Sequence, residues 1–349
     1  MGIVQADEER LVRDNRASGD LAAEGAAIDA LLSANPTNLA ALLMRGDCHR
    51  RAGDPRAAAS FFQAALDQAR ALPSPAPPAL AAPLQAAQAF VAARANDFRM
   101  TLETAVGKTS GARLRHALDM LIGKREIFQQ QPSALYFPYL PQRQFYEREE
   151  FPWAAGIEAA TPAIHAELVA LIDGGADFRP YIELEQNRPH RDFHRLAGDP
   201  SWSAFYLWKD GDVVPDNAAR CPATMAALER VPLSRIGRRT PAVLFSLLRP
   251  GAHIPPHYGM LNSRLICHLP LTVPPDCWLR VGNETRQWEE GKLLIFDDSI
   301  EHEAKNSSNR LRVILLFDIW KPELDQAERA GVSAIFDAID DYRGIAEDH

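Results

Sequence analysis

Six short runs rich in β-forming residues, separated by turns, dominate the chain from residue 242 to residue 320. They read AVLFSLL, RLICHLPLTV, CWLRVG, TRQWEE, KLLIFDD and LRVILLFDIW. Strands of this length and spacing predict a β-sandwich or barrel, and a jelly roll is the form that we expect. The dipeptides Gly282-Asn283 and Glu290-Gly291 are predicted to form hairpin turns between successive strands.

The first third of the chain has a different pattern. Residues 8–126 are rich in Ala, Leu and Arg, with apolar spacings of three and four, which predicts helices. Residues 39–72 match one tetratricopeptide-like unit, which neighbouring helices would have to cap. The matching positions are Leu42, Gly46 and His49 on a first helix, Gly53-Asp54 in the turn, and Ala58, Phe62 and Ala65 on a second helix. A plain helical bundle is the alternative.

Prolines and changes in composition divide the chain further. The run at residues 73–78 breaks the helical pattern and predicts a loop within the helical region. Residues 133–151 carry prolines and aromatic residues without a helical period, as expected of a chain laid across the surface of another domain. A helix is predicted from about residue 162 to residue 172, and SAIFDAIDDY predicts a short closing helix. We therefore expect a multidomain α + β chain, with a helical tetratricopeptide-like domain at 1–130, a jelly-roll domain at 131–326 and a helical tail at 327–349.

The composition excludes several classes of protein. The 349 residues are 46% apolar and 24% charged, which is ordinary for a globular protein. A net charge of −8 argues against nucleic acid as a partner, because nucleic-acid-binding domains carry a basic face. The sequence begins without a signal-peptide pattern, and no apolar run approaches the ~20 residues of a transmembrane segment. The four cysteines form no CxxC pair, which indicates free thiols in a reducing compartment and predicts a cytoplasmic protein.

Two histidines and an arginine in the β-rich region suggest a metal site. His257 follows Pro255-Pro256, which we expect to end the preceding strand, and His302 follows the run KLLIFDD and a short turn. Arg312 lies on a strand predicted to begin just after His302, and a buried arginine there needs an anion such as an oxo-acid carboxylate. Two histidines and one carboxylate are the usual ligands of mononuclear Fe(II), but Gly259 occupies the usual carboxylate position. A structural role is the alternative for each histidine.

The two-residue alternation of a strand adds further candidates. Arg264, Ile266 and His268 share one face of their strand, and Ser246 faces inward from another run. A serine, a histidine and two arginines around an apolar interior would bind a small dicarboxylate. For Arg264, a surface ion pair with one of the many acidic residues is the alternative.

Two stretches closely resemble the catalytic domain of the aspartyl/asparaginyl β-hydroxylases. They are FSLLRPGAHIPPHYGMLNSRLICHLPL and CWLRVGNETRQWEEGKLLIFDDSIEHEAKNSSNRLRVILLFDIWKPEL. The resemblance is dense over residues 242–324 and thinner at SWSAFYLWKDG and at PYLP near residue 138. It implies an Fe(II)- and 2-oxoglutarate-dependent oxygenase that consumes O2 and has a double-stranded β-helix at residues 131–326. In animals such domains carry an attached tetratricopeptide region.

The resemblance also implies roles for the candidate residues. His257 and His302 match the two iron ligands of the family. Arg312 and Ser246 match the residues that hold the distal carboxylate of 2-oxoglutarate, and His268 matches a contact to the carboxylate nearer the iron. Gly259 matches as well, because the family lacks the third protein ligand and has water in its place.

One position departs from the animal members of the family. Ile266 stands where they have a second arginine, so a contact to the metal-proximal carboxylate is in doubt. Arg264 lies on the same face and is expected to substitute for it in part. The resemblance further implies that Asp297 and Asp298 support the metal site, although a polar turn after a strand is an equally good interpretation of these two residues.

The implied activity is β-hydroxylation of an Asp or Asn side chain in a peptide or protein substrate, with the helical region helping to present it. Three alternatives stay open. The family includes lipid A-type hydroxylases of fatty acyl chains, although no membrane segment supports that choice here. The open position beside Gly259 would also accept chloride, as in iron halogenases. Finally, the chain could be a repeat scaffold with an inactive barrel, against which the joint presence of His257, His302 and Arg312 argues.

Overall fold

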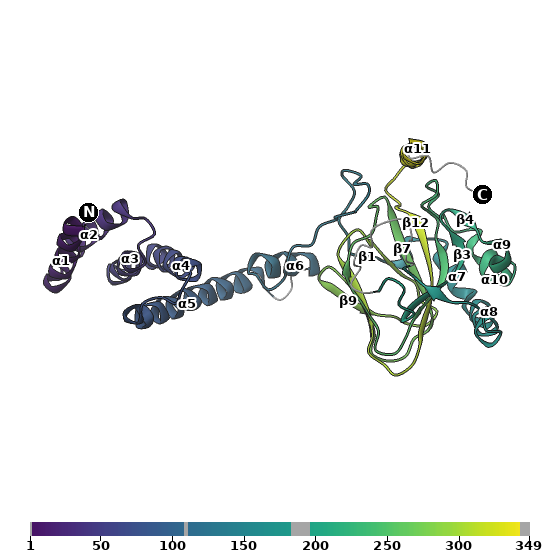
Figure 1. Cartoon of the computed structure of the whole chain (residues 1–349), viewed down its shortest axis with the longest axis horizontal. Coiled ribbons are helices and arrows are strands. Elements are labelled where there is room, and N and C mark those ends of the chain that lie inside the picture. The colour runs from purple at the N-terminus through teal and green to yellow at the C-terminus, as the bar shows by residue number, and fades with distance from the viewer. Residues whose placement is uncertain (1, 108–110, 183–195, 343–349) are drawn as a thin grey trace. The chain divides into compact units, whose positions relative to one another are not determined.

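The computed structural model describes residues 2–107, 111–182 and 196–342. The chain divides into two compact units, Met1–Arg125 and Glu126–His349. The predicted order of a helical region followed by a jelly-roll domain is confirmed (Figure 1). Among the described residues, no helix combines the length and the apolar character needed to cross a membrane.

The described part of the first unit is helical. Its elements are α1 (Gly2–Ser18), α2 (Leu21–Ala34), α3 (Leu39–Arg51), α4 (Pro55–Ala71), the short 3₁₀ helix η1 (Pro78–Leu80), α5 (Ala81–Val106) and α6 (Ala112–Leu121). Three of the helices start at a polar side chain that accepts hydrogen bonds from backbone N–H groups of the first turn. These caps are Asp20 for α2, Asn38 for α3 and Asp54 for α4.

The predicted helix–turn–helix pair at residues 39–72 is present as α3 and α4. Gly53 in the turn has φ +77°, a conformation that favours glycine. Gly46 of α3 lies against the ring of Phe62 on α4, and a Cβ at residue 46 would come within 2.5 Å of that ring. The absence of a side chain at Gly46 therefore sets how closely the two helices approach. That this pair is a tetratricopeptide unit stays a prediction.

Two antiparallel sheets form the second unit. In the described residues the larger sheet has eight strands in the order β1-β10-β7-β12-β5-β3-β2, with β4 paired to β3, and the smaller sheet has the order β6-β11-β8-β9. The strands are β1 (Phe145–Tyr146), β2 (Arg179–Pro180), β3 (Trp202–Lys209), β4 (Asp212–Val213), β5 (Val243–Leu248), β6 (His253–His257), β7 (Arg264–Thr272), β8 (Cys277–Val281), β9 (Glu284–Gln287), β10 (Leu294–Phe296), β11 (His302–Asn306) and β12 (Arg312–Trp320).

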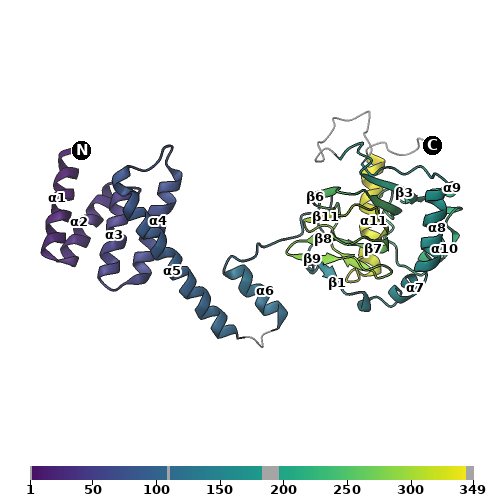
Figure 2. The same cartoon turned by 90° about the horizontal axis from the view of Figure 1, so that it is seen from below.

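Each face of the larger sheet has its own apolar core. Leu265, Cys267 and Leu269 of β7 belong to the core shared with α7 (Ala154–Ala159), α8 (Thr161–Asp173) and α10 (Pro222–Leu228). These helices lie on the side of the unit opposite the smaller sheet (Figure 2). Ile266 belongs to a second core, built from residues of both sheets. The helix predicted at residues 162–172 is confirmed as α8. The remaining short elements of this unit are η2 (Arg148–Glu150) and α9 (Pro215–Ala218).

The segment at residues 133–151 runs along the β unit. The backbone N–H of Ser133 donates to the carbonyl of Gly259 at 3.0 Å, and Phe145 pairs with Phe296 in the sheet. The predicted closing helix is the second half of a longer helix, α11 (Gln326–Tyr342), whose Val332 and Phe336 pack in a core with Trp320. The rest of the predicted tail, residues 343–349, lies outside the described residues.

Three local predictions about the strands were wrong. Pro255 and Pro256 do not end a strand but lie inside β6, which tolerates them because it is an edge strand of the smaller sheet. The strand after His302 is β11 of the smaller sheet, whereas Arg312 opens β12 in the larger one. Glu290-Gly291 joins β9 to β10 in different sheets, so it is a crossover and not a hairpin. The hairpin at Gly282-Asn283 is present between β8 and β9.

We predict that Gly46→Ala destabilises the helical unit by about 1–3 kcal/mol, because the new methyl group must displace the Phe62 ring. This loss would outweigh the gain in helix propensity, which is about 1 kcal/mol. Hydrogen exchange of the α3 and α4 amides in the full chain measures the effect. Gly331→Ala in α11 is the matched control, since a Cβ at residue 331 meets nothing within 4 Å. Slower exchange in α3 and α4 after Gly46→Ala would contradict the prediction.

Candidate active site

The two candidate histidines are cross-strand neighbours. His257 ends β6, His302 begins β11, and the two residues are paired in the sheet. Their ring centroids lie 4.0 Å apart. The Nδ1 atoms lie 2.8 Å and 3.1 Å from the carbonyl oxygens of Pro255 and Ile300. A carbonyl can only accept, so Nδ1 carries a proton in both rings.

Burial keeps His302 suitable for binding a cation. The pKa of His302 lies well below its usual value of 6.5, because the ring is buried and His257 lies beside it. A neutral imidazole with its lone pair on Nε2 is the form that ligates a metal. Among the described residues, however, no group of three or more His, Cys, Asp or Glu side chains is placed to hold a metal ion. A metal here would have two protein ligands and several open positions.

A carboxylate fills the space beside Gly259. The backbone N–H of Gly259 donates to the carbonyl of Asp298 at 2.6 Å, and a Cβ added to Gly259 would collide with the Asp298 carboxylate. That carboxylate is buried, and its Oδ1 has no hydrogen-bond partner among the described residues. Burial raises its pKa to about 6, against the lowering effect of Arg264. No side chain larger than glycine fits at position 259 unless Asp298 moves.

Arg312 is a buried cation without an acidic partner. It is 1% exposed, and no ion pair joins it to an acid among the described residues. Within the described part of the chain, its Nη1 makes only long contacts to Ser246, 3.3 Å to the carbonyl and 3.5 Å to Oγ, and its Nε has no partner. The guanidinium lies over the Trp288 ring, 4.9 Å from its centroid. Burial lowers the pKa of Arg312 to about 10, so the group is still charged and requires an anion.

Ser246 and His268 line the same region. Ser246 lies opposite Ile314 of β12, and its Oγ accepts from Trp202 Nε1 at 3.2 Å. Trp288 Nε1 donates to His268 Nδ1 at 3.3 Å, so the proton of the neutral His268 ring is on Nε2. Burial and then the charge of Arg312 lower the pKa of His268 well below 6.5, which keeps the ring neutral. His268 is therefore a hydrogen-bond donor near Arg312.

Phe296 connects His268 to the histidine pair. Its ring centroid lies 4.9 Å from that of His268 and 5.5 Å from that of His302. Ile266, buried in the same core, adds a further apolar wall. The structure thus brings five of the six candidate residues around one apolar interior: His257, His302, Ser246, His268 and Arg312.

Arg264, the sixth candidate, is held by two acidic residues. Its Nη1 lies 2.8 Å from Asp318 and its Nη2 lies 3.0 Å from Asp298. Asp318 is fully buried and also accepts from Ser234 Oγ and from the backbone N–H of Ala242. These two ion pairs are not the surface contact that was the alternative for Arg264, because Arg264 is itself largely buried. Asp298 and Asp318 together balance the positive charge of Arg264 within the protein.

A buried ion pair that the sequence did not predict orders the loops of the site. Lys321 Nζ lies 2.6 Å from Asp297 Oδ2, and both side chains are 0% exposed. Asp297 also accepts from Gln130 Nε2 at 2.6 Å and from the backbone N–H and hydroxyl of Ser299. Asn262 donates to Gln130 Oε1 at 2.9 Å. The network joins the loop before His302 to the loop after His257. Lys321 follows an apolar strand, and no local sequence pattern marks it as buried.

This fold and site define a class of protein. Two antiparallel sheets enclose a histidine pair and a buried arginine that has no acidic partner among the described residues, which is the arrangement of a double-stranded β-helix with a candidate metal centre. Among solved structures, the Schizosaccharomyces pombe Cnp3 cupin domain is similar over 42% of this chain and 74% of that chain, at 11% identity and a TM-score of 0.24. The assignment of the fold rests on the sheet topology alone.

Comparison with known families finds a match for the β unit. Residues 158–322 match the family model described as aspartyl/asparaginyl beta-hydroxylase. An ornithine lipid ester-linked acyl 2-hydroxylase of Rhizobium tropici is 37% identical over 180 residues, 51% of this chain and 60% of the relative. The aspartyl/asparaginyl beta-hydroxylase of Mus musculus is 42% identical over 142 residues, 40% of this chain and 19% of the relative.

A third relative extends the same match. Aspartate beta-hydroxylase domain-containing protein 2 of Xenopus tropicalis is 38% identical over 213 residues, 59% of this chain and 55% of the relative. The chain covers less than two thirds of each of these three relatives. The chain is therefore similar to named hydroxylases over part of their length.

We predict that Lys321→Met destabilises the β unit by about 3–5 kcal/mol, because Asp297 would be left as a buried charge without its partner. Tryptophan fluorescence during urea unfolding reports this unit, since the six tryptophans of the chain all follow residue 150. The double variant Lys321→Met with Asp297→Asn should recover most of the loss. Lys292→Met is the control: its partly exposed pair with Glu158 should contribute less than about 1 kcal/mol. Equal effects of Lys321→Met and Lys292→Met would contradict the role of the buried pair.

Proposed function

We propose that the β unit is an Fe(II)- and 2-oxoglutarate-dependent oxygenase that hydroxylates an unactivated C–H bond. The observation that carries this proposal is Arg312, a buried guanidinium with no acidic partner among the described residues. Such a group calls for a ligand carboxylate, which an oxo-acid provides. The buried, neutral His302 and its cross-strand neighbour His257 supply two nitrogen ligands of the kind that non-haem iron prefers.

Each residue has a defined part in this proposal. His257 and His302 would hold the metal through Nε2. Arg312 and Ser246 would bind the distal carboxylate of 2-oxoglutarate, and the Nε2–H of His268 would donate to the carboxylate nearer the metal. Bound there, Fe(II) with 2-oxoglutarate and O2 supplies the oxidising power that breaks the C–H bond. The apolar side chains of Phe296 and Ile266 would exclude water from the interior.

Two features of this chain modify the cosubstrate site. Ile266 provides no cation, and Arg264 is engaged by Asp298 and Asp318. We therefore propose that Arg264 orients Asp298 and contributes little to binding 2-oxoglutarate directly. Asp298 would then keep its Oδ1 as a hydrogen-bond acceptor beside Gly259, at the position where most related sites have a ligating carboxylate.

Turnover of 2-oxoglutarate tests the proposal. Wild-type protein supplied with Fe(II) and O2 should form succinate, and His302→Ala should abolish it. Arg312→Gln should raise the KM for 2-oxoglutarate at least about tenfold, because hydrogen bonds to a charged group contribute roughly 1.5–3 kcal/mol. Arg310→Gln, an exposed arginine two residues away, is the control and should leave KM unchanged. Absence of succinate with iron-loaded wild type would exclude the oxygenase.

For the substrate we propose the β-carbon of an Asp or Asn side chain in a peptide or protein. The support is the family model together with the 42% identity to the murine aspartyl/asparaginyl beta-hydroxylase. The helical unit would help to present such a substrate. A mass increase of one oxygen on the Asp or Asn residue of a test peptide is the expected product.

A fatty acyl chain is the second candidate substrate. The observation in its favour is the 37% identity to the acyl 2-hydroxylase of Rhizobium tropici, over a longer stretch than in the murine relative. The two substrates are distinguished by offering the protein a peptide and an acylated ornithine lipid in parallel. Oxygen incorporated only into the lipid would select the acyl hydroxylase.

Halogenation and a non-catalytic scaffold are less well supported. Chloride would have to lie beside Gly259, where the buried carboxylate of Asp298 would repel it. An inactive barrel would leave the buried charge of Arg312 uncompensated, because it has no acidic partner among the described residues. We also infer a cytoplasmic location, supported by four buried cysteines that form no disulfide.

We predict that Gly259→Asp, which restores the usual ligand position, lowers Fe(II) affinity instead of raising it. The new side chain would occupy the space of the Asp298 carboxylate and add a second negative charge there. The double variant Gly259→Asp with Asp298→Gly should bind metal at least as tightly as wild type. Titration with Co(II), followed by visible absorption, measures this. Tighter binding by the single variant than by the double variant would contradict the prediction.

A further inference from the structure

A cavity of about 410 Å³ lies within the helical unit. Its lining residues come from α1, α3, α4, η1 and α5: Arg16, Ala40, Leu43, Met44, Asp47, Arg50, Phe62, Leu80, Pro83, Ala86 and Phe90. All but three of these side chains are apolar. A cavity of this size and character is typical of a ligand site, for which volumes of roughly 300–1,000 Å³ are usual.

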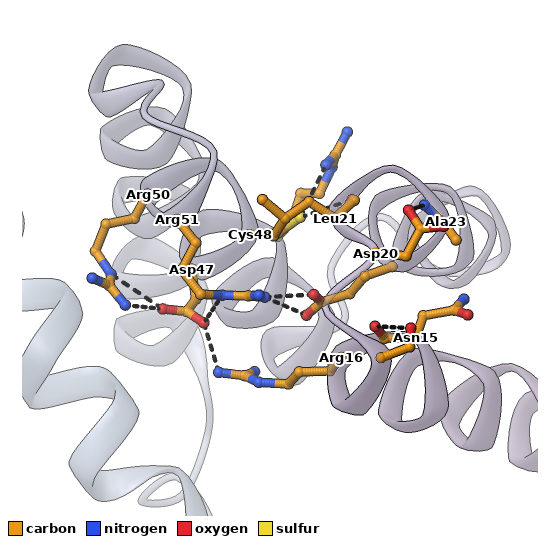
Figure 3. A network of polar contacts seen from close by, with 12 residues as sticks. Asn15, Arg16, Asp20, Leu21, Ala23, Asp47, Cys48, Arg50 and Arg51 are labelled. Atoms are coloured by element: carbon orange, nitrogen blue, oxygen red, sulfur yellow. Dashed lines mark hydrogen bonds and ion pairs between the residues drawn. The ribbon is translucent and has the colours of Figure 1, made fainter.

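The three polar residues of the lining form one charged group. Asp47 accepts from Arg16 Nη2 at 2.7 Å and from Arg50 Nη2 at 2.7 Å. Arg51 Nε lies 3.1 Å from Asp47 Oδ2, and Arg51 also forms an ion pair with Glu24, which is fully buried (Figure 3). Three guanidinium groups thus meet two carboxylates, so the group carries a surplus positive charge.

The surplus charge is accessible to a ligand. The side chains of Arg16 and Arg50 are 48% and 49% exposed. Arg16 uses only Nη2 in its hydrogen bond to Asp47, so further N–H donors point away from that bond. By contrast, Arg51 is largely enclosed by its two acidic partners. The cavity therefore combines a mainly apolar lining, here called its floor, with two half-exposed arginines, here called its rim.

We propose that this cavity binds an acidic peptide, with apolar side chains on the floor and a carboxylate at Arg16 and Arg50. The charge at the rim selects an anionic partner, and guanidinium groups bind carboxylates through paired hydrogen bonds. The apolar floor spans several helices, which suits the apolar face of a short amphipathic helix. This site lies in the helical unit and does not depend on the hydroxylase proposed for the β unit.

Fluorescence anisotropy of the full chain tests the proposal. The probe is a fluorescein-labelled peptide with leucines one helical turn apart and aspartates between them, and the comparison peptide has asparagine for each aspartate. The acidic peptide should bind, with an affinity that falls as salt concentration rises. The asparagine peptide should bind at least about tenfold more weakly.

Two pairs of variants locate the binding. Ala86 lines the cavity and is exposed, so Ala86→Trp should fill it and weaken binding about tenfold or more, whereas Ala89→Trp, exposed on the same helix but not in the lining, should not. Arg16→Gln with Arg50→Gln should reduce the preference for the acidic peptide, whereas Arg56→Gln, an exposed arginine outside the lining, should not. Circular dichroism of each variant excludes unfolding.

Three results would overturn the proposal. One is equal affinity for the acidic and asparagine peptides. Another is binding of the acidic peptide that Ala86→Trp leaves unchanged. The third is displacement of the dye-labelled peptide by decanoate at far lower concentration than by unlabelled peptide, which would identify the cavity as a fatty-acid site.

Discussion

The ion pair between Asp297 and Lys321 is the interaction on which the geometry of the β unit's site depends. Both side chains are removed from water, so their charges are stable only together and with further hydrogen bonds. Gln130 and Ser299 supply those bonds to Asp297. The loop that leads to His302 is therefore anchored from its first residue, at the end of the larger sheet.

The same anchor explains how two sheets present one site. His257 and His302 belong to the smaller sheet, whereas Ser246, His268 and Arg312 belong to the larger one. The loop from Asp297 to His302 crosses between the sheets and carries Asp298, whose side chain fills the space beside Gly259. A shift of this loop would move the candidate metal ligand and the neighbouring carboxylate together. The chemistry we propose needs these two groups in fixed relation to the anion-binding end.

Much of this arrangement could be predicted from the sequence, because strand alternation is a local property. In the strands that contain Ser246, His268 and Arg312, these side chains face the interior, as the two-residue alternation predicts. The prolines of β6 led to a wrong prediction, because prolines are tolerated inside a strand when that strand lies at the edge of a sheet. The local sequence does not show which strands lie at an edge. The partners of Arg264 could not be predicted either. Asp298 and Asp318 are distant from it in the chain, and only the folded structure brings their charges to one guanidinium.

Strand β7 has one further consequence. Leu265, Cys267 and Leu269 serve the helix-covered core, while the alternate residues Ile266 and His268 face the site. One set of β7 side chains thus packs against the helices and the other set lines the interior between the sheets. A substitution at position 266 would change the wall of the candidate site and the second core, while Leu265 and Cys267 on either side would still pack against the helices. The interior of the domain can therefore be reshaped from this strand without loosening its outer face.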